Sequence, residues 1–356
     1  MLLDENLVRQ LSRLDGLLVA DRPVPRAAEL RRLLEERVGR LEKLAPLSPA
    51  EAAAWFGGRS LAAVDGSVNG LGGAFPYLLQ LFQALCKTSH GERTVASEVF
   101  SPLMPGVQAR IDELTAQGLP REAALRLLSG RRLSALELQV ARRAIREYRP
   151  RLVLFDGGFM RYLRHAPEEW EKYCALALEL DVLSVGVIEE VASFQLAGAL
   201  GSERDETAGD GAGNVFSPPG DVSGGDGRPG AGGSVRPIVY DRELLFGVLA
   251  PGECLFVRPE VEVKNAGLYT VFARLSRHPG AVAVDFLCEQ AGAALQIMRY
   301  LYTITPSGGR GIPLFLDLVD AEVRLTHREI GLLTEACLDP AVRECFFTAR
   351  RERRDY

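Results

Sequence analysis

Cysteine and histidine are scarce in this sequence, which holds six cysteines and four histidines in 356 residues. The cysteines form no CxxC pair, and the histidines form no HxH or HExxH pattern. A zinc site built on thiolates or imidazoles is therefore not expected. The cysteines are scattered and stand mostly among apolar residues, a usage typical of reduced core thiols in a cytoplasmic protein.

Long apolar runs and a leader pattern are also missing. No stretch of about 18 consecutive apolar residues occurs, which argues against a membrane-spanning helix. The first ten residues, MLLDENLVRQ, lack a basic segment followed by an apolar one and so do not resemble a signal peptide. We expect a cytoplasmic protein without a membrane partner.

Neither sign of charge dominates the sequence. It has 42 Lys and Arg residues against 47 Asp and Glu residues, a formal net charge of −5. This balance argues against a basic coat protein for nucleic acid but leaves room for a local basic groove. The hydrophobic share of 47% and charged share of 25% are those of a globular protein. The length allows two or three domains, or one large α/β domain with additions.

The amino-terminal half of the chain alternates predicted helices and strands. Apolar residues recur at helical spacing in Leu7–Leu18 and Ala27–Leu44, which predicts a helical hairpin in an N-terminal extension, residues 1–50. Residues 51–340 follow the strand–helix–strand order of an α/β domain with a parallel pair of strands. The predicted strands are Leu61–Val64, Arg93–Phe100, Arg151–Phe155 and Val182–Ile188, with Ala74–Leu85 either strand or helix; the predicted helices are Leu119–Tyr148, in two pieces broken near Ser129-Gly130, and Glu168–Leu180.

A glycine-rich segment opens the carboxyl-terminal half. Residues 201–235 hold eleven glycines and few large apolar side chains, which predicts a disordered insertion. No GxxxxGK[ST] or GxGxxG pattern opens a helix there, so a phosphate-binding loop is not expected. Residues 341–356 are expected to form a C-terminal tail. Other predictions are helices Asp241–Leu249 and Glu289–Tyr302, strands Cys254–Val263, Tyr269–Arg274 and Ala281–Phe286, an extended Ile312–Leu318, and a helix Thr326–Leu338 with the capping-box spacing of Thr326 and Glu329.

Two apolar strands each end in Asp-Gly, AAVDGS at Asp65 and VLFDGG at Asp156. Sites in open α/β sheets form at the carboxyl ends of strands, and a glycine after the aspartate permits close approach. Two such aspartates on neighbouring strands make an oxygen site suited to Mg²⁺ or Mn²⁺. Because Asp-Gly is also a common turn dipeptide, a structural role for both is the alternative.

Further carboxylates lie near these strands in the sequence. Glu137 belongs to a predicted helix that leads directly into the strand of Asp156, although a lone helical Glu is usually solvated. Asp320, in LFLDLVDAE, is a fourth candidate, and Asp317 and Asp241 are its alternatives.

The order and spacing of these motifs resemble the NurA nuclease family over about Leu61–Leu338. VDGS at Asp65 is similar to the family's first acidic motif, and the helix of Glu137 running into LFDGGF is similar to the second and third. The segments VGVIEE, YDRELL and IPLFLDLVDAE stand where the family has its later motifs.

The resemblance implies an RNase H-like mixed sheet flanked by helices and a metal-dependent deoxyribonuclease. The activity that it implies is an exonuclease that resects DNA ends 5′ to 3′ in double-strand-break repair, with endonuclease cleavage of single-stranded DNA as an additional expectation. A toroidal homodimer and a partnership with the hexameric HerA translocase ATPase are implied as well. Asp65, Glu137 and Asp156 fall on the family's acidic metal ligands, and Asp320 would be a fourth. We expect two Mn²⁺ or Mg²⁺ ions, about 3.5–4 Å apart.

The sequence departs from the family pattern in three places. Gly158 stands where a Ser is usual, Glu189 and Glu190 stand where a Lys is frequent, and Asp320 stands where a His is frequent. Aspartate can bind a metal but cannot supply imidazole acid–base chemistry. The last two departures slightly favour a rival interpretation, a catalytically weakened DNA-binding or ATPase-docking subunit, whereas the retention of Asp65, Glu137 and Asp156 argues against it. An RNA-directed RNase H-like nuclease is a further alternative.

Basic and aromatic residues near the motifs are candidates for DNA contact. Arg242, Arg274 and Arg277 are predicted to meet the phosphate backbone, and Tyr240 is predicted to stack on an unpaired base, as is Tyr269. Packing in the core is the alternative for each of them.

Overall fold

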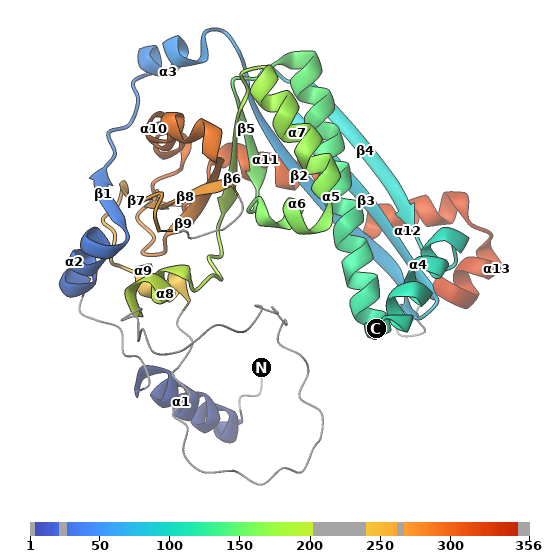
Figure 1. The fold of residues 1–356 in the computed structure, drawn as a ribbon. Helices are drawn as coiled ribbons and strands as arrows, with labels where there is room; N and C mark the ends of the chain where they lie inside the picture. The colour runs from blue at the N-terminus through green and yellow to red at the C-terminus, as the bar shows by residue number, and fades with distance from the viewer. Residues whose placement is uncertain (1–3, 21–26, 202–239, 262–266, 348–356) are drawn as a thin grey trace.

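A nine-stranded mixed sheet in the order β1-β7-β8-β9-β6-β5-β2-β3-β4 forms the centre of the molecule (Figure 1). The computed structural model describes residues 4–20, 27–201, 240–261 and 267–347. The strands are β1 (Gly39–Lys43), β2 (Leu61–Ala74), β3 (Tyr77–Thr88), β4 (Arg93–Phe100), β5 (Leu152–Asp156), β6 (Leu183–Ile188), β7 (Glu253–Val257), β8 (Leu268–Arg274) and β9 (Val282–Leu287).

Three adjacent strands, β2, β5 and β6, run parallel to one another. On one side of them β3 and β4 continue the sheet as an antiparallel meander, and on the other side β9, β8, β7 and β1 pair antiparallel. Because β2 and β5 are parallel neighbours, the Asp-Gly motifs at Asp65 and Asp156 come to the same region of the sheet.

Helices cover both faces of the sheet. On one face α4 to α7 pack against the central strands, and α2, α8 and α9 pack against β7 to β9. On the other face α10 and α11 pack against the central strands, and η1 leads into α10. The helices are α1 (Glu5–Ala20), α2 (Ala27–Arg37), α3 (Pro49–Phe56), α4 (Pro105–Ala116), α5 (Arg121–Tyr148), α6 (Met160–His165), α7 (Pro167–Glu179), α8 (Gln195–Gly201), α9 (Asp241–Leu245), η1 (Cys288–Ala293), α10 (Ala294–Ile304), α11 (Leu314–Val323), α12 (His327–Cys337), α13 (Pro340–Val342) and η2 (Arg343–Phe347).

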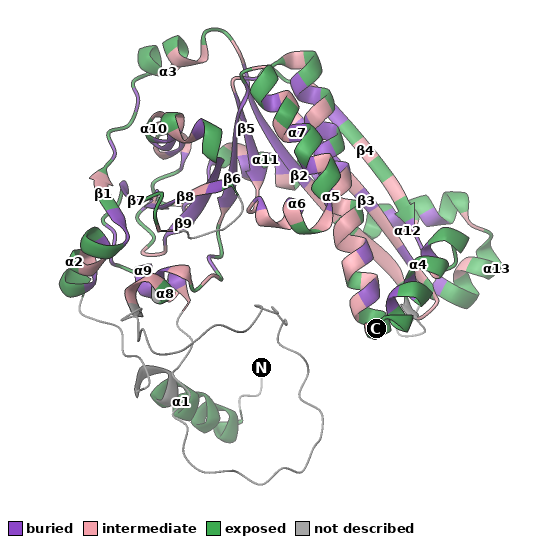
Figure 2. Cartoon of the chain, viewed as in Figure 1, coloured by how far each residue is buried: buried purple, intermediate pink, exposed green. Residues whose placement is uncertain are grey.

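Burial follows this layering. Figure 2 shows buried residues concentrated in the central strands, whereas the described side chains of α1 are exposed. No helix of the described ranges is long and apolar enough to cross a membrane.

The predicted break near Ser129-Gly130 is wrong, because α5 runs without interruption from Arg121 to Tyr148. A Cβ placed on Gly130 would lie 2.9 Å from Cε1 of His165. The glycine therefore makes room for a side chain of α6. A helix tolerates such a glycine at a cost of about 1 kcal/mol relative to alanine.

Two other predicted elements differ in the structure. The helix predicted over Ala27–Leu44 ends at Arg37, and β1 then pairs with the edge strand β7, so this part of the amino-terminal extension belongs to the sheet. The segment Ile312–Leu318 is not extended, because α11 starts after Pro313. Its buried residues Leu316, Val319 and Val323 have helical spacing. Only Leu316 falls within the predicted segment, so that segment alone does not show the spacing.

Several other predictions are confirmed. Ala74–Leu85 falls mainly in strand β3, and β4 has the predicted bounds. Both hydrogen bonds of the capping box between Thr326 and Glu329 are present at the start of α12. The start of the predicted tail differs from the prediction, because α13 and η2 are helical there and Phe346 stacks on Tyr77 of β3 with ring centroids 4.4 Å apart. Most of the predicted insertion, from residue 202 onward, lies outside the described residues.

Candidate active site

Asp65 and Asp156 lie side by side on the α11 face of the sheet. In the parallel pairing of β2 with β5, Val64 is opposite Phe155, so the two aspartates follow at the next position of each strand. The alternation of side chains along a strand places Asp65 on the same face as Ala63, whose core includes α11. Asp65 is 5% exposed, and Asp156 is half-buried.

Glu137 reaches the same site from helix α5, on the opposite face of the sheet. Its side chain is fully buried, so the solvated position usual for a lone helical Glu does not apply. A Cβ placed on Gly66 would lie 2.5 Å from Glu137 Oε1 and 2.7 Å from Leu133 Cδ1. The glycine of the first Asp-Gly motif therefore leaves the space that the carboxylate of Glu137 occupies.

An arginine and a tyrosine from α6 hold the second oxygen of Glu137. Arg161 Nη2 lies 2.6 Å from Glu137 Oε2, and the hydroxyl of Tyr162 donates a hydrogen bond of 2.6 Å to that same oxygen. Arg161 Nη2 also donates to the Tyr162 hydroxyl over 2.6 Å. The other oxygen, Glu137 Oε1, is buried and has no hydrogen-bond partner among the described residues.

All three carboxyl groups have raised pKa values. Burial, together with the charges of Asp156 and Glu137, raises the pKa of Asp65 to about 7. Burial raises the pKa of Glu137 against the opposing effects of Arg161 and Tyr162. Burial also raises the pKa of Asp156; Arg161 lowers it, and the charge of Asp320 raises it. Crowded carboxylates with raised pKa values are a frequent mark of a functional site.

The raised pKa of Asp65 predicts a pH dependence of stability in the metal-free protein. Between the ordinary aspartate value near 3.8 and about 7, the folded chain binds a proton at Asp65 that the unfolded chain has released. The free energy of unfolding should therefore fall as the pH rises through this window, by up to about 1.4 kcal/mol per pH unit. Above pH 7 this contribution should level off.

Urea unfolding in a chelator at pH 4.5, 6.0 and 7.5 measures this dependence. Since other groups also titrate, the informative quantity is the difference between the wild type and Asp65→Asn. A slope with pH that is unchanged in Asp65→Asn would contradict the assignment.

A turn after Asp156 is fixed by a buried carboxylate on β9. Asp285 Oδ2 accepts a hydrogen bond from the backbone N–H of Phe159 over 3.2 Å, and Asp285 Oδ1 accepts one from Thr270 over 2.9 Å. A Cβ on Gly158 would lie 2.7 Å from Ile188 Cδ1 and 3.0 Å from Asp285 Oδ2. This packing explains why glycine stands where the family pattern usually has serine.

Gly158→Ser should therefore destabilise the protein by about 1–3 kcal/mol, the usual cost of overpacking. Ile188→Ala removes the nearer obstacle, so the double variant should lose less than the sum of the two single variants. Urea unfolding of the four proteins gives this coupling free energy. Strict additivity would show that the contact with Ile188 does not exclude serine.

The remaining acidic candidates have different surroundings. Asp320, on α11, pairs with Arg324 over 2.7 Å but lies close enough to Asp156 to affect its pKa. Asp317 pairs with Arg310 over 2.6 Å. Asp241 is fully buried, and its carboxylate accepts hydrogen bonds from the start of α8, including one of 3.0 Å from Leu196 N. This position gives Asp241 a capping role rather than a place beside Asp156.

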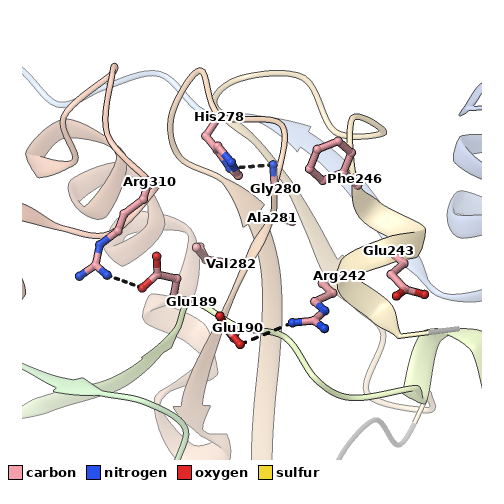
Figure 3. A pocket seen from close by; sticks show the side chains of 10 residues that line it. All are labelled: Glu189, Glu190, Arg242, Glu243, Phe246, His278, Gly280, Ala281, Val282 and Arg310. Carbon is pink, nitrogen blue, oxygen red and sulfur yellow. Dashed lines mark hydrogen bonds and ion pairs between the residues drawn. The ribbon is translucent and has the colours of Figure 1, made fainter. Parts of the chain in front are cut away.

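A cavity of about 500 Å³ adjoins the carboxyl end of β6, next to the strand of Asp156. Figure 3 shows Arg310 facing Glu189 and Arg242 facing Glu190, with nitrogen–oxygen distances of 2.6 and 3.4 Å. The two glutamates that replace the expected lysine are thus each paired with an arginine. The lining residues are Glu189, Glu190, Arg242, Glu243, Phe246, His278, Gly280, Ala281, Val282 and Arg310.

The residues predicted to contact DNA differ in their surroundings. Arg242 lines this cavity, and its guanidinium lies 5.3 Å from the ring centroid of Tyr240. Arg277 is exposed. The guanidinium of Arg274 instead donates to three backbone carbonyls, including Leu249 O over 2.9 Å, and so stabilises the surrounding turns. Tyr269 is half-buried and packs against Phe286.

The carboxylates suit a hard divalent cation, although they do not form a finished site. In the described part of the chain, no three His, Cys, Asp or Glu side chains converge closely enough to hold a metal ion as they stand. Glu137 Oε2 is engaged by Arg161 and Tyr162 instead. Even so, the donor set is all oxygen, and the buried Oε1 of Glu137 lacks a partner within the described ranges. Mg²⁺ and Mn²⁺ prefer this chemistry.

The sequence profile of the NurA domain matches residues 59–325. The chain belongs to the NurA family. Family membership identifies it as a nuclease, in agreement with the resemblance of its acidic motifs. The NurA domain contains Asp65, Glu137 and Asp156, and it ends just before the capping box of α12. No curated protein matches the chain.

One solved nuclease structure shares this fold, and two others align more weakly. The crystal structure of the NurA nuclease from Sulfolobus solfataricus aligns with a TM-score of 0.51 at 13% identity, covering 95% of this chain and 99% of that one. Human endonuclease V aligns with a TM-score of 0.33 at 13% identity, covering 87% and 98%. Endonuclease V of Ciona intestinalis, in complex with inosine-containing DNA, gives 0.31 at 9%, covering 86% and 96%. The predicted α/β fold, a mixed sheet flanked by helices, is confirmed.

Four residues of the site were missed by reasoning from the sequence. Arg161 and Tyr162 follow the third motif directly, in GGFMRYLR, but a basic and an aromatic residue in a helix carry no specific signal. Arg310 is distant in sequence from Glu189, to which it pairs. Gly66 was recognised as permitting close approach, but not as the place where Glu137 enters.

Proposed function

We propose that this nuclease is a divalent-metal-dependent deoxyribonuclease that hydrolyses phosphodiester bonds at DNA ends. The observation that supports this most is the pairing of β2 with β5, which sets Asp65 beside Asp156 within the NurA domain, with Glu137 of α5 buried against Gly66. Asp65, Asp156 and Glu137 would hold Mn²⁺ or Mg²⁺, with two ions expected and Asp320 near enough to Asp156 to act as an outer ligand. Bound there, the metal supplies an activated water and stabilises the leaving oxygen.

The residues of the chain have distinct tasks in this proposal. Asp65 and Asp156 carry negative charge on two rigid, paired strands, and β2 and β5 therefore fix their spacing. Arg242 and Arg310 line the neighbouring cavity and would contact the phosphate backbone by exchanging their present partners, Glu190 and Glu189, for phosphate oxygens. Tyr240, beneath the guanidinium of Arg242, is a candidate for stacking on a base.

Partners are proposed from family membership together with exposed apolar surface. We propose a homodimer that works with a HerA-type hexameric ATPase in 5′ to 3′ resection of DNA ends. Helix α1 exposes Leu7, Val8, Leu11 and Leu14, each by about half of its surface, with helical spacing. Unpaired apolar stripes of this kind are typical of interaction surfaces. The amino-terminal helices are therefore candidates for one of these contacts.

Cleavage of end-labelled substrates tests the proposed activity. Single-stranded DNA, duplex DNA and RNA of matched sequence are incubated with the full chain in Mn²⁺, Mg²⁺ or chelator, with and without the ATPase. Metal-dependent shortening of DNA from its ends supports the proposal, whereas preferential cleavage of RNA would favour the RNA-directed alternative. No cleavage under any condition, with DNA binding retained, would favour the scaffold alternative. The pairing of Glu137 with Arg161 is the feature that most favours that rival.

A further inference from the structure

Arg161 is a cation that acts on all three carboxylates at once. Its Nη2 is 2.6 Å from Glu137 Oε2. Its positive charge also lowers the pKa values of Asp65 and Asp156, which burial raises. The guanidinium lies beside the turn after β5, where a Cβ on Gly157 would be 3.7 Å from Arg161 Cζ. A positive charge thus already sits among the carboxylates that are proposed to bind a metal.

Tyr162 fixes Arg161 in this place. Its hydroxyl accepts a hydrogen bond from Arg161 Nη2 and donates one to Glu137 Oε2. The polar groups of Arg161, Tyr162 and Glu137 therefore each contact the other two. The Tyr162 side chain is fully buried, and Arg161 Cζ lies 4.7 Å from the centre of its ring. The arrangement is a built contact rather than a chance surface pairing.

The same arrangement leaves polar atoms unsatisfied. Within the described ranges, Glu137 Oε1 and Arg161 Nε are both buried without a hydrogen-bond partner. Each such atom lowers the stability of the folded protein. The ion pair between Arg161 and Glu137 therefore leaves one polar atom of each residue unsatisfied. A divalent ion near Glu137 would satisfy its free oxygen but would meet a like charge at Arg161.

We propose that Arg161 is a built-in counter-cation, which holds Glu137 Oε2 in the metal-free protein, offsets part of the negative charge of the site and competes with the divalent ion for Glu137. The inference rests on the proposed metal-dependent function. Three crowded carboxylates repel one another, and a resident guanidinium offsets this repulsion before a metal arrives. The cost is weaker metal binding, because the ion must displace or tolerate Arg161.

Isothermal titration of the full chain with Mn²⁺, after treatment with a chelator, tests this competition. Arg161→Gln should bind Mn²⁺ about tenfold more tightly or better, because a like charge beside the ion has been removed. The matched control is Arg142→Gln, which breaks a comparable ion pair with Glu169 between α5 and α7, away from the carboxylates, and should leave the affinity unchanged. Asp65→Asn should lose binding.

Thermal unfolding gives a second readout on the same proteins. Metal-free Arg161→Gln should melt below the wild type, and its melting temperature should rise more on addition of Mn²⁺. If Arg161→Gln does not fold, Arg161→Lys tests the same point. It keeps the charge but cannot contact Glu137 and Tyr162 with one planar group. Because Glu137 Oε2 is then released, Arg161→Lys should bind Mn²⁺ more tightly than the wild type, by less than about tenfold since the like charge remains.

The outcomes separate the two proposals. Equal or weaker Mn²⁺ binding by Arg161→Gln, or by Arg161→Lys in its place, would overturn the inference and show that Arg161 positions Glu137 as a ligand. If the wild type binds Mn²⁺ and Asp65→Asn does not, the proposed metal site stands whatever Arg161 does. Equal binding by the wild type and Asp65→Asn would instead overturn the metal site itself.

Discussion

Asp65→Asn should abolish DNA cleavage while leaving the fold intact. The substitution removes a charge that would hold the divalent ion and its activated water, so activity should fall by roughly 10³-fold or more. In the metal-free state the same change relieves repulsion among buried carboxylates, and the free energy of unfolding at neutral pH should stay level or rise. Cleavage of end-labelled DNA and urea unfolding measure the two effects.

Other carboxylates extend this test. Asp156→Asn and Glu137→Gln should behave like Asp65→Asn, whereas Asp320→Asn should be milder because Asp320 is paired with Arg324. Stabilisation by Mn²⁺ should shrink in the first two variants. Asp112→Asn, an exposed position on α4, is the matched control and should change neither measurement. Cleavage by Asp65→Asn at the wild-type rate in Mn²⁺ would show that the metal assignment is wrong.

Gly66→Ala should impair the site through a single methyl group. The new Cβ would lie 2.5 Å from Glu137 Oε1 and 2.7 Å from Leu133 Cδ1, so both side chains must move. Overpacking of this kind costs about 1–3 kcal/mol of stability. A misplacement of about 1 Å in a catalytic group can cost about 10²-fold in rate, so a fall in cleavage of at least that size is expected.

A glycine in open space provides the control for this substitution. Nothing lies within 4 Å of a Cβ built on Gly106 in α4, so Gly106→Ala should keep wild-type activity, with a stability equal to that of the wild type or up to about 1 kcal/mol higher. Cleavage rates, Mn²⁺ affinity and urea unfolding are compared for both variants. Full activity in Gly66→Ala would mean that Glu137 does not need its observed position over β2.

The pairing of the two aspartates was within reach of sequence reasoning. Asp65 and Asp156 each end an apolar run and precede glycine, and such runs predict buried strands whose carboxyl ends form sites. The structure pairs those strands directly, with Val64 opposite Phe155. Local patterns also located β4 and the capping box at Thr326 correctly, since both depend on neighbours in sequence.

Secondary structure predicted from local sequence patterns was wrong where a contact between distant parts of the chain determines the local conformation. Gly130 looked like a helix break, yet it is explained by His165 packing against α5. The residues after Arg37 had helical spacing, yet the open edge of β7 makes them a strand. In both cases a tertiary contact outweighs a local propensity of about 1 kcal/mol or less per residue.

The sequence by itself determined the family and the two aspartates that end the apolar runs of β2 and β5. Only the tertiary structure decided that Glu137 is buried over Gly66, that Arg161 and Tyr162 hold it, and that Asp241 caps α8. The physical reason is the range of the forces involved. Periodicity and turn chemistry act over a few neighbouring residues, whereas the partners of a buried charge are set by how α5 and α6 pack on the sheet.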